Sequence, residues 1–152
     1  MDQSLTSGPG ELLFDHIGIV VPDLERGIRK LAAILGEVSW TRRFDDSRLG
    51  VSVQFARDRA GITYELIAPL TANSPVARTV KSGADLLNQL AYRTNSLEAA
   101  VDRLRSQGSL PITLPTPAMA FGGARVQFLM TPLGFLLELI EVDRCVHDFL
   151  PP

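Results

Sequence analysis

Cysteine and histidine are scarce in this sequence, with one cysteine and two histidines in 152 residues. A single cysteine excludes an intrachain disulfide and a cysteine metal cluster, so a reducing cytoplasm is the expected compartment. No run of 18 or more apolar residues is present, which excludes a typical membrane-spanning helix. The first ten residues lack a basic start and an apolar core, so they do not have the pattern of a signal peptide.

A basic excess is missing as well, because 15 basic and 17 acidic residues give a net charge of -2. Proteins that bind nucleic acids or anionic membrane surfaces usually carry a basic excess, so neither partner is expected. The sequence has no glycine-rich phosphate-binding motif, no Ser-His-Asp set and no zinc-finger spacing. No motif around Cys145 would activate it as a nucleophile, so an unreactive thiol is expected there.

The sequence does have a 45% hydrophobic share, which is enough for a core in one domain or in two small halves. Residues 14–21 are rich in β-branched side chains and are expected to form a strand that Pro22 ends. Asp23 is the expected N-cap of a helix over residues 24–35, whose apolar residues fall on one face. Gly36 is expected to end this helix.

Similar signals recur along the chain. Further strands are expected at residues 51–56, 62–68, 87–94, 124–130 and 135–142, and a second helix is expected from Ser96 to Gly108. The charged stretch 40–50 is expected to contain a strand and a loop. Residues 71–83 are expected to be a connector with one helical turn, and residues 110–123 an irregular segment rich in proline and glycine.

An internal repeat organises these elements. At a single offset of 73 residues, Leu24-Glu25 coincides with Leu97-Glu98, Val-Gln-Phe at 53–55 with 126–128, and Glu-Leu-Ile at 65–67 with 138–140. The offset fits the whole module without a gap. We therefore predict an α+β fold made of two tandem βαβββ modules that pack together, because one module could not cover its own sheet.

The repeat also predicts the domain organisation. Residues 1–12 are expected to be a flexible tail and residues 13–142 one domain. Within that domain, module one covers 13–70, a connector covers 71–84 and module two covers 85–142. Residues 143–152 are expected to form a C-terminal tail.

The same offset pairs the polar residues that could carry chemistry. It takes His16 to Gln89 and Glu65 to Glu138, so each module has one polar residue on its first strand and one carboxylate on its last. Strand alternation puts the small residues Gly18 and Ala91 on the faces of His16 and Gln89. Small residues at these positions would leave room for a metal ion, water or substrate.

A metal ion would explain this set of residues. Without a cation, two carboxylates buried beside an imidazole would repel each other, and burying their charges would be unfavourable. One imidazole nitrogen, two carboxylates and one amide oxygen suit a borderline or hard divalent ion. A single strand histidine is more often a hydrogen-bonded core residue, and a single glutamate at a strand end is usually solvated. The argument for a metal therefore depends on the symmetric pairs, and Gln89 is the weakest of the four ligands.

The stretches FDHIGIVVPDLERGI, YELIAP and GFLLELIE resemble the vicinal oxygen chelate superfamily, which includes glyoxalases, bleomycin resistance proteins and dioxygenases. Within it, the chain is most similar to methylmalonyl-CoA epimerase-like glyoxalase proteins. The resemblance implies a cupped, incomplete β-barrel with the helices outside. It also implies one divalent metal ion (Co, Ni, Mn, Zn or Mg) held by His16, Glu65, Gln89 and Glu138. The family usually has histidine where this chain has Gln89, which disfavours a ring-cleaving dioxygenase.

The resemblance further implies a metal-dependent isomerase or lyase that abstracts a proton next to a metal-polarised carbonyl. The substrate would be a thioester such as an acyl-CoA, or a hemithioacetal as in lactoylglutathione lyases. Epimerases of this type have a glutamate just before the second strand of module one, where this chain has Arg48, with Asp45 and Asp46 close by. The expected catalytic carboxylates are therefore Glu138 and Glu65. The alternative is a metal-free protein that binds a small molecule, as antibiotic-resistance relatives do.

Three further expectations concern the surroundings of the site. Arg93 shares the strand face of Gln89 and either binds a substrate carboxylate or phosphate or reaches solvent. The mixed charges of residues 42–48 form either a solvated loop or a rim for an anionic coenzyme tail. Residues 115–123 are either a lid or an ordinary connector. The family resemblance also implies a homodimer.

Overall fold

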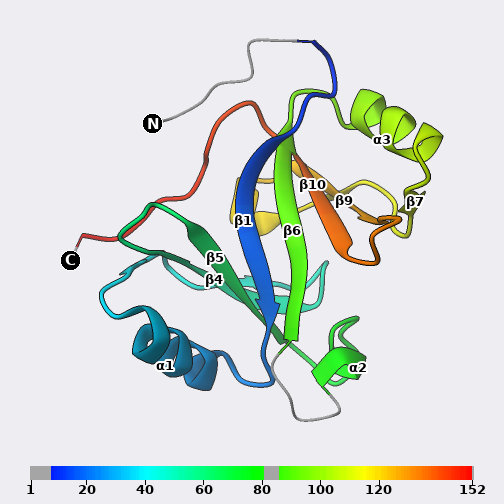
Figure 1. Cartoon of the computed structure of the whole chain (residues 1–152). Coiled ribbons are helices and arrows are strands. Elements are labelled where there is room, and N and C mark those ends of the chain that lie inside the picture. Colours follow the sequence, from blue (N-terminus) through cyan, green and yellow to red (C-terminus); the bar gives the residue numbers. More distant parts are fainter. Residues whose placement is uncertain (1–7, 81–85, 152) are drawn as a thin grey trace. The chain divides into compact units, whose positions relative to one another are not determined.

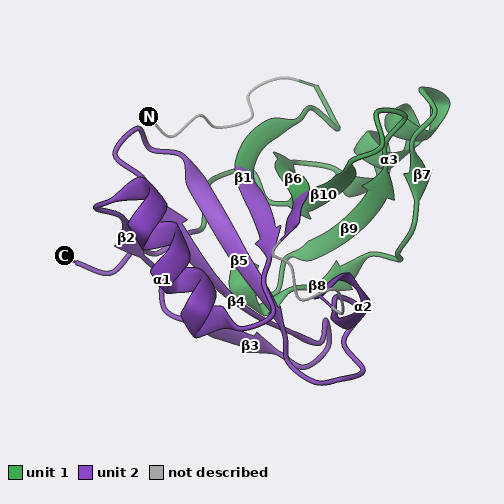
Figure 2. Ribbon diagram, turned by 60° about the horizontal axis from the view of Figure 1, so that its bottom comes forward, with its two compact units in different colours: residues 1–15, 89–146 green, residues 16–88, 147–152 purple. Residues whose placement is uncertain are grey.

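The computed structural model describes residues 8–80 and 86–151 (Figure 1). It divides into two compact units, shown in different colours in Figure 2. Unit 2 contains residues 16–88 and 147–152, and unit 1 contains residues 1–15 and 89–146. Residues 1–7 of the expected N-terminal tail and residues 81–84 of the expected connector lie outside the described residues. In the described part of the chain, no helix is long and apolar enough to cross a membrane.

The sheet of module one has the order β2-β4-β5-β1. Strands β1 and β5 are parallel, β4 and β5 are antiparallel, and the short β2 and β3 both pair with β4. The strands are β1 (Leu13–Val20), β2 (Ser39–Trp40), β3 (Phe44–Asp46), β4 (Val51–Arg57) and β5 (Thr63–Pro69). The charged stretch 40–50 thus contributes two short strands to this sheet.

Helix α1 (Leu24–Leu35) begins and ends where the sequence predicts. The Asp23 carboxylate accepts a hydrogen bond from the backbone N–H of Arg26 at 2.8 Å, and Gly36 follows the helix with a φ of +78°. Leu24 and Leu31 lie on the buried face of the helix. They pack in one apolar cluster with residues of β4 and β5, namely Ala56, Leu66 and Ala68. The helix therefore covers one face of this sheet.

The second module repeats the arrangement, with the strand order β6-β10-β9-β7. Strands β6 and β10 are parallel, and β10 and β9 are antiparallel. Its strands are β6 (Leu86–Thr94), β7 (Leu110–Pro111), β8 (Thr116–Pro117), β9 (Arg125–Met130) and β10 (Leu136–Glu141), and its helix is α3 (Leu97–Ser106). The expected helical turn in the connector is α2 (Ala77–Val80). The predicted α+β class and the two βαβββ modules are confirmed.

Residues 110–123 are more regular than the sequence predicts. Strands β7 and β8 both pair with β9, and a 3₁₀ helix (Met119–Phe121) follows them. Each of these strands is only two residues long and ends in a proline, Pro111 or Pro117. Proline has no N–H to donate to a ladder, which limits these strands. One more backbone hydrogen bond follows each proline, from Ile112 to the Phe128 carbonyl and from Ala118 to the Ala124 carbonyl. The prediction of an irregular segment was wrong for these short pieces.

The glutamine and the phenylalanine of the repeated Val-Gln-Phe sequence make equivalent hydrogen bonds to a threonine in both modules. The Gln54 side chain donates to the Thr41 carbonyl at 2.7 Å, and the Gln127 side chain donates to the Thr113 carbonyl at 2.9 Å. In both modules the backbone N–H of the following phenylalanine donates to the hydroxyl of the same threonine. The two threonines are 72 residues apart. The gap-free offset of 73 is therefore wrong for this part of the repeat.

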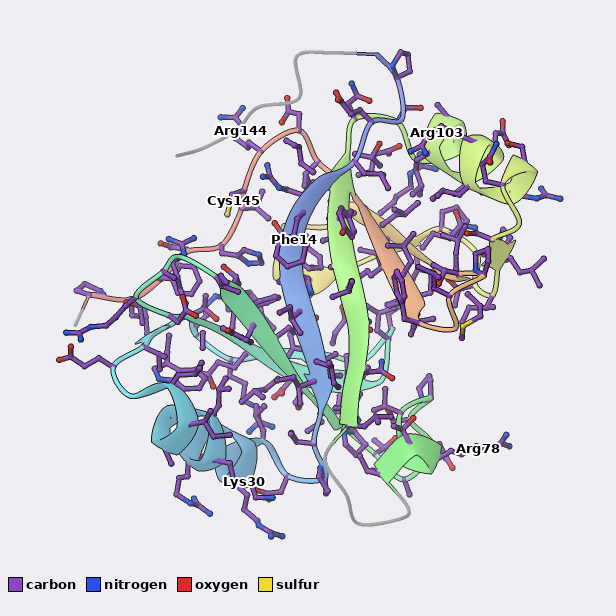
Figure 3. All side chains as sticks on the ribbon, viewed as in Figure 1. Phe14, Lys30, Arg78, Arg103, Arg144 and Cys145 are labelled. Atoms are coloured by element: carbon purple, nitrogen blue, oxygen red, sulfur yellow. The ribbon has the colours of Figure 1, made fainter. Side chains whose placement is uncertain are left out.

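Residues near both ends of the described chain form hydrogen bonds with the unit to which they belong. In unit 1, Arg103 on α3 donates to the Gly10 carbonyl at 3.0 Å (Figure 3). Gly10 has a φ of +79°, and a Cβ there would lie 2.7 Å from the Ala100 nitrogen, so only glycine fits. In unit 2, the Leu150 N–H donates to the Trp40 carbonyl at 2.8 Å, and Phe149 forms a β-bridge with Thr41.

The N-cap of α1 gives a stability prediction. Asp23→Ala should lower the free energy of unfolding by about 1 kcal/mol, because the Arg26 N–H loses its acceptor at the helix N-terminus. Urea denaturation followed by circular dichroism measures the change. Asp23→Asn keeps a side-chain acceptor and should lose much less, and Asp102→Ala, on the exposed face of α3, is the surface control. Equal losses for Asp23→Asn and Asp23→Ala would contradict the capping role.

Candidate functional site

The first pair of candidate residues lies inside unit 2. His16 is on β1 and Glu65 is on the neighbouring parallel strand β5, where Glu65 is in register with Gly18. A 2.8 Å hydrogen bond joins His16 Nε2 to Glu65 Oε2. The histidine side chain is completely buried and the glutamate is 5% exposed. Burying a carboxylate in a sheet is unfavourable unless a partner stabilises it, and the imidazole provides one here.

The second pair has the same construction inside unit 1. Gln89 is on β6 and Glu138 is on the parallel strand β10, in register with Ala91. Gln89 Nε2 donates to Glu138 Oε2 at 2.5 Å, and both side chains are buried. A glutamine that donates through Nε2 offers its carbonyl oxygen as its only side-chain acceptor. The structure therefore brings the members of each pair together, while their role as metal ligands stays a prediction.

The two pairs differ in what surrounds them. The His16 ring makes edge contacts with Phe55 at 5.3 Å and with His147 at 5.8 Å between ring centroids. The Phe55 and His147 rings lie 4.3 Å apart. His147 belongs to the C-terminal residues that were expected to be a tail outside the repeat. No spacing or periodicity relates it to His16, so the only signal in the sequence is that it is the second of two histidines.

The structure contradicts one of the two expectations for Arg93. It is 6% exposed, so the interpretation as a strand-end arginine that reaches solvent was wrong. Its Nε lies 3.3 Å from Oδ1 of Asp15, and this ion pair is within unit 1. Arg93 Nε and Nη1 are buried and have no hydrogen-bond partner among residues 8–80 and 86–151. Buried N–H donors normally have hydrogen-bond partners, so these two donors need a structural or functional explanation.

The acidic residues near Arg48 are occupied by local interactions. Asp45 accepts hydrogen bonds from the Ser52 hydroxyl and the Arg43 guanidinium, which lower the pKa of its carboxyl group. Asp46 accepts the backbone N–H groups of Arg48 and Leu49. Arg48 itself is exposed. The carboxylates of Asp45 and Asp46 are thus held by local hydrogen bonds.

Two remaining residues outside the pairs fit structural roles. Arg42 lies over the Phe44 ring at 4.2 Å, a cation–π contact on the same short strand region as Asp45. Cys145 is partly buried in the segment after β10 (Figure 3). Neither observation assigns chemistry to them.

The chemistry of the donor atoms fits a divalent ion. Within unit 2 an imidazole nitrogen and a carboxylate oxygen meet directly, and within unit 1 an amide and a carboxylate do so. Imidazole, carboxylate and amide oxygen are ligands for ions such as Mn, Co, Ni, Zn and Mg. Small residues, Gly18 and Ala91, stand beside the two carboxylates in the strand register. The described residues thus contain candidate ligand groups for a divalent metal.

Comparisons with known proteins agree with this geometry. Residues 15–128 match the model of the Glyoxalase/Bleomycin resistance protein/Dioxygenase superfamily. The chain is 31% identical over 132 residues to an ethylmalonyl-CoA/methylmalonyl-CoA epimerase of Cereibacter sphaeroides, covering 86% of this chain and 96% of the relative.

Solved structures show the same fold. A methylmalonyl-CoA epimerase of Mycobacterium tuberculosis is 28% identical, with a TM-score of 0.69 over 84% of this chain and 85% of that protein. A hypothetical protein of Bacillus halodurans is 24% identical, with a TM-score of 0.75 over 90% and 99% of the two chains. The matching epimerases are enzymes whose names specify acyl-CoA substrates.

Replacing Gln89 tests how much it stabilises the buried carboxylate of Glu138. In protein kept metal-free with a chelator, Gln89→Leu should lower the free energy of unfolding by about 1–3 kcal/mol, because Glu138 loses a buried donor. Gln89→His keeps a side-chain N–H that can donate and should lose less. Urea denaturation of the three proteins makes the comparison. A Gln89→Leu variant as stable as the wild type would show that the hydrogen bond contributes nothing.

Proposed function

Because the chain belongs to the glyoxalase/bleomycin resistance protein/dioxygenase superfamily, we propose that it is a metal-dependent epimerase of an acyl-CoA thioester. The observation that carries this proposal is the pair of buried glutamates, Glu65 and Glu138, held at equivalent strand positions in the two modules. The identity to an acyl-CoA epimerase along almost the whole of that relative supports the choice of substrate class. The homodimer and the cytoplasmic location stay predictions.

We propose His16, Glu65, Gln89 and Glu138 as the ligands of one divalent ion. When bound, such an ion supplies Lewis-acid polarisation of a substrate carbonyl, which makes an adjacent C–H more acidic. The rings of Phe55 and His147 restrain His16 for this role, and a bound ion would replace the hydrogen bond between His16 Nε2 and Glu65. Gln89 would contribute its carbonyl oxygen, since its Nε2 is used on Glu138. Ligands held in this way need little reorganisation on binding.

The proton transfer is assigned to the two glutamates. Epimerisation removes a proton from one face of a carbon and returns a proton to the other face, so two groups that exchange protons serve it directly. One carboxylate from each module, Glu65 and Glu138, supplies two such groups. Asp45 and Asp46 are engaged in hydrogen bonds of their own strand and turn, and Arg48 cannot act as a base. Each glutamate would thus act as ligand and base together.

The binding of a metal ion separates this proposal from the metal-free alternative. After chelator treatment, wild-type protein should take up about one Mn, Co, Ni or Zn ion per chain in native mass spectrometry. At an ion concentration of about 100 Kd, binding should stabilise the protein by about 2.7 kcal/mol in thermal unfolding. Glu138→Ala should abolish both effects, whereas Glu37→Ala, on an exposed surface residue, should keep them. A wild type that takes up none of these ions would leave the metal-free binding protein as the function.

Isotope exchange tests the chemistry. In D₂O, the metal-loaded protein should exchange the C2 proton of methylmalonyl-CoA, as followed by mass spectrometry. Glu65→Gln and Glu138→Gln keep an oxygen ligand but cannot accept the proton, so each should slow exchange by about 100-fold or more. Exchange at the wild-type rate in both variants would remove the two glutamates from the mechanism. An absence of label in methylmalonyl-CoA and ethylmalonyl-CoA with metal-loaded wild type would overturn the epimerase proposal.

A further inference from the structure

Arg93 is a buried cation whose hydrogen-bonding groups are only partly used. Of the five N–H donors of a guanidinium, the structure gives one ion-pair contact, from Nε to Asp15 at 3.3 Å, without hydrogen-bond geometry. Nε and Nη1 are buried and lack a hydrogen-bond partner among the described residues. Arginine is the side chain suited to bind a carboxylate through two parallel hydrogen bonds. An anionic oxygen would satisfy the Nη1 donor that Asp15 leaves open.

The strand register places Arg93 next to the candidate base of unit 1. Gln89, Ala91 and Arg93 are buried and alternate along β6, so they share one face of the strand. On the neighbouring strand β10, Glu138 is in register with Ala91 and Ile140 with Arg93. Glu138 thus lies one step of about 7 Å along the sheet from the level of Arg93. The intervening side chain on that face is alanine, the smallest with a Cβ.

This spacing corresponds to the dimensions of one kind of thioester. In a 2-carboxyacyl thioester, the carbon that carries the acidic proton also carries a carboxylate. A base that reaches this proton and a cation that holds this carboxylate must therefore stand a few ångströms apart on the same face. Glu138 and Arg93 meet this requirement on their adjacent strands, whereas a neutral hemithioacetal would give Arg93 no partner.

We propose that Arg93 binds the free carboxylate of a 2-carboxyacyl thioester and thereby selects malonyl-type thioesters over simple acyl thioesters and hemithioacetals. The proposal rests on the proposed function, since it names the substrate class of the same site. Asp15 has the role of a positioning residue, because its contact with Nε restrains the guanidinium in the free protein. The Arg93 Nη1 donor is the group assigned to the substrate.

Binding measurements test the proposal without requiring turnover. Isothermal titration of metal-free protein with methylmalonyl-CoA and with propionyl-CoA, which lacks the 2-carboxylate, measures the preference directly. Wild type should bind methylmalonyl-CoA more tightly. Arg93→Met should weaken methylmalonyl-CoA binding by about 10- to 100-fold, the range of one hydrogen bond to a charged group, and leave propionyl-CoA binding within about threefold. Arg93→Lys should recover part of the loss, because lysine keeps the charge but not the fork.

Two controls keep folding effects separate from recognition. Arg93→Met leaves Asp15 buried without its cation, so the double variant Asp15→Asn with Arg93→Met removes both charges of the pair and should show the same substrate selectivity. Arg105→Met removes an exposed charge from α3 and should bind like wild type. Circular dichroism and thermal unfolding confirm that each variant is folded.

The outcomes are distinct. Equal weakening toward methylmalonyl-CoA and propionyl-CoA, or weaker competition by coenzyme A itself, would assign Arg93 to the coenzyme phosphates or to the fold and overturn the proposal. Unchanged binding of both thioesters would overturn it as well. Selective weakening in a protein that shows no C2–H exchange would support the carboxylate site while the epimerase assignment fails.

Discussion

The pairing of two parallel strands in each module is the constraint on which the candidate site depends. Glu65 is buried because β5 runs beside β1, and Glu138 is buried because β10 runs beside β6. A shift of the register by one residue would turn each glutamate to the other face of its sheet. Parallel neighbours also need a crossover connection. In each module that crossover holds the helix, which covers the sheet and helps to lock the register.

The two modules use this common framework for different side chains. In unit 2 the carboxylate is bonded to an imidazole, and aromatic rings from β4 and from the C-terminal residues surround that imidazole. In unit 1 the carboxylate is bonded to an amide, and a buried arginine stands along the same strand face. An imidazole and a buried guanidinium are thus contributed by different halves of the chain.

Position in the fold distinguishes Glu65 and Glu138 from the other carboxylates that accept hydrogen bonds. Asp45, Asp46 and Glu141 all accept hydrogen bonds from donors on their own or neighbouring elements, and these interactions fix strands, turns and the start of α3. Glu65 and Glu138 lie on the last strand of each module, where each is instead hydrogen-bonded to a side chain of the neighbouring first strand, an imidazole in one module and an amide in the other. This distinction supports the two glutamates as the functional acids.

Local and periodic features of the sequence determined much of this protein. The bounds of α1 follow from Asp23 and Gly36, and the repeat assigns His16 and Glu65 to the first and last strands of one module and Gln89 and Glu138 to those of the other. Tertiary structure alone decided that Arg93 is buried, that His147 lies against Phe55, and that the proline-rich segment adds two short strands. These features depend on contacts between residues far apart in the chain. Helix and strand periods record only which face of an element is apolar, so they carry no information about which distant segment covers it.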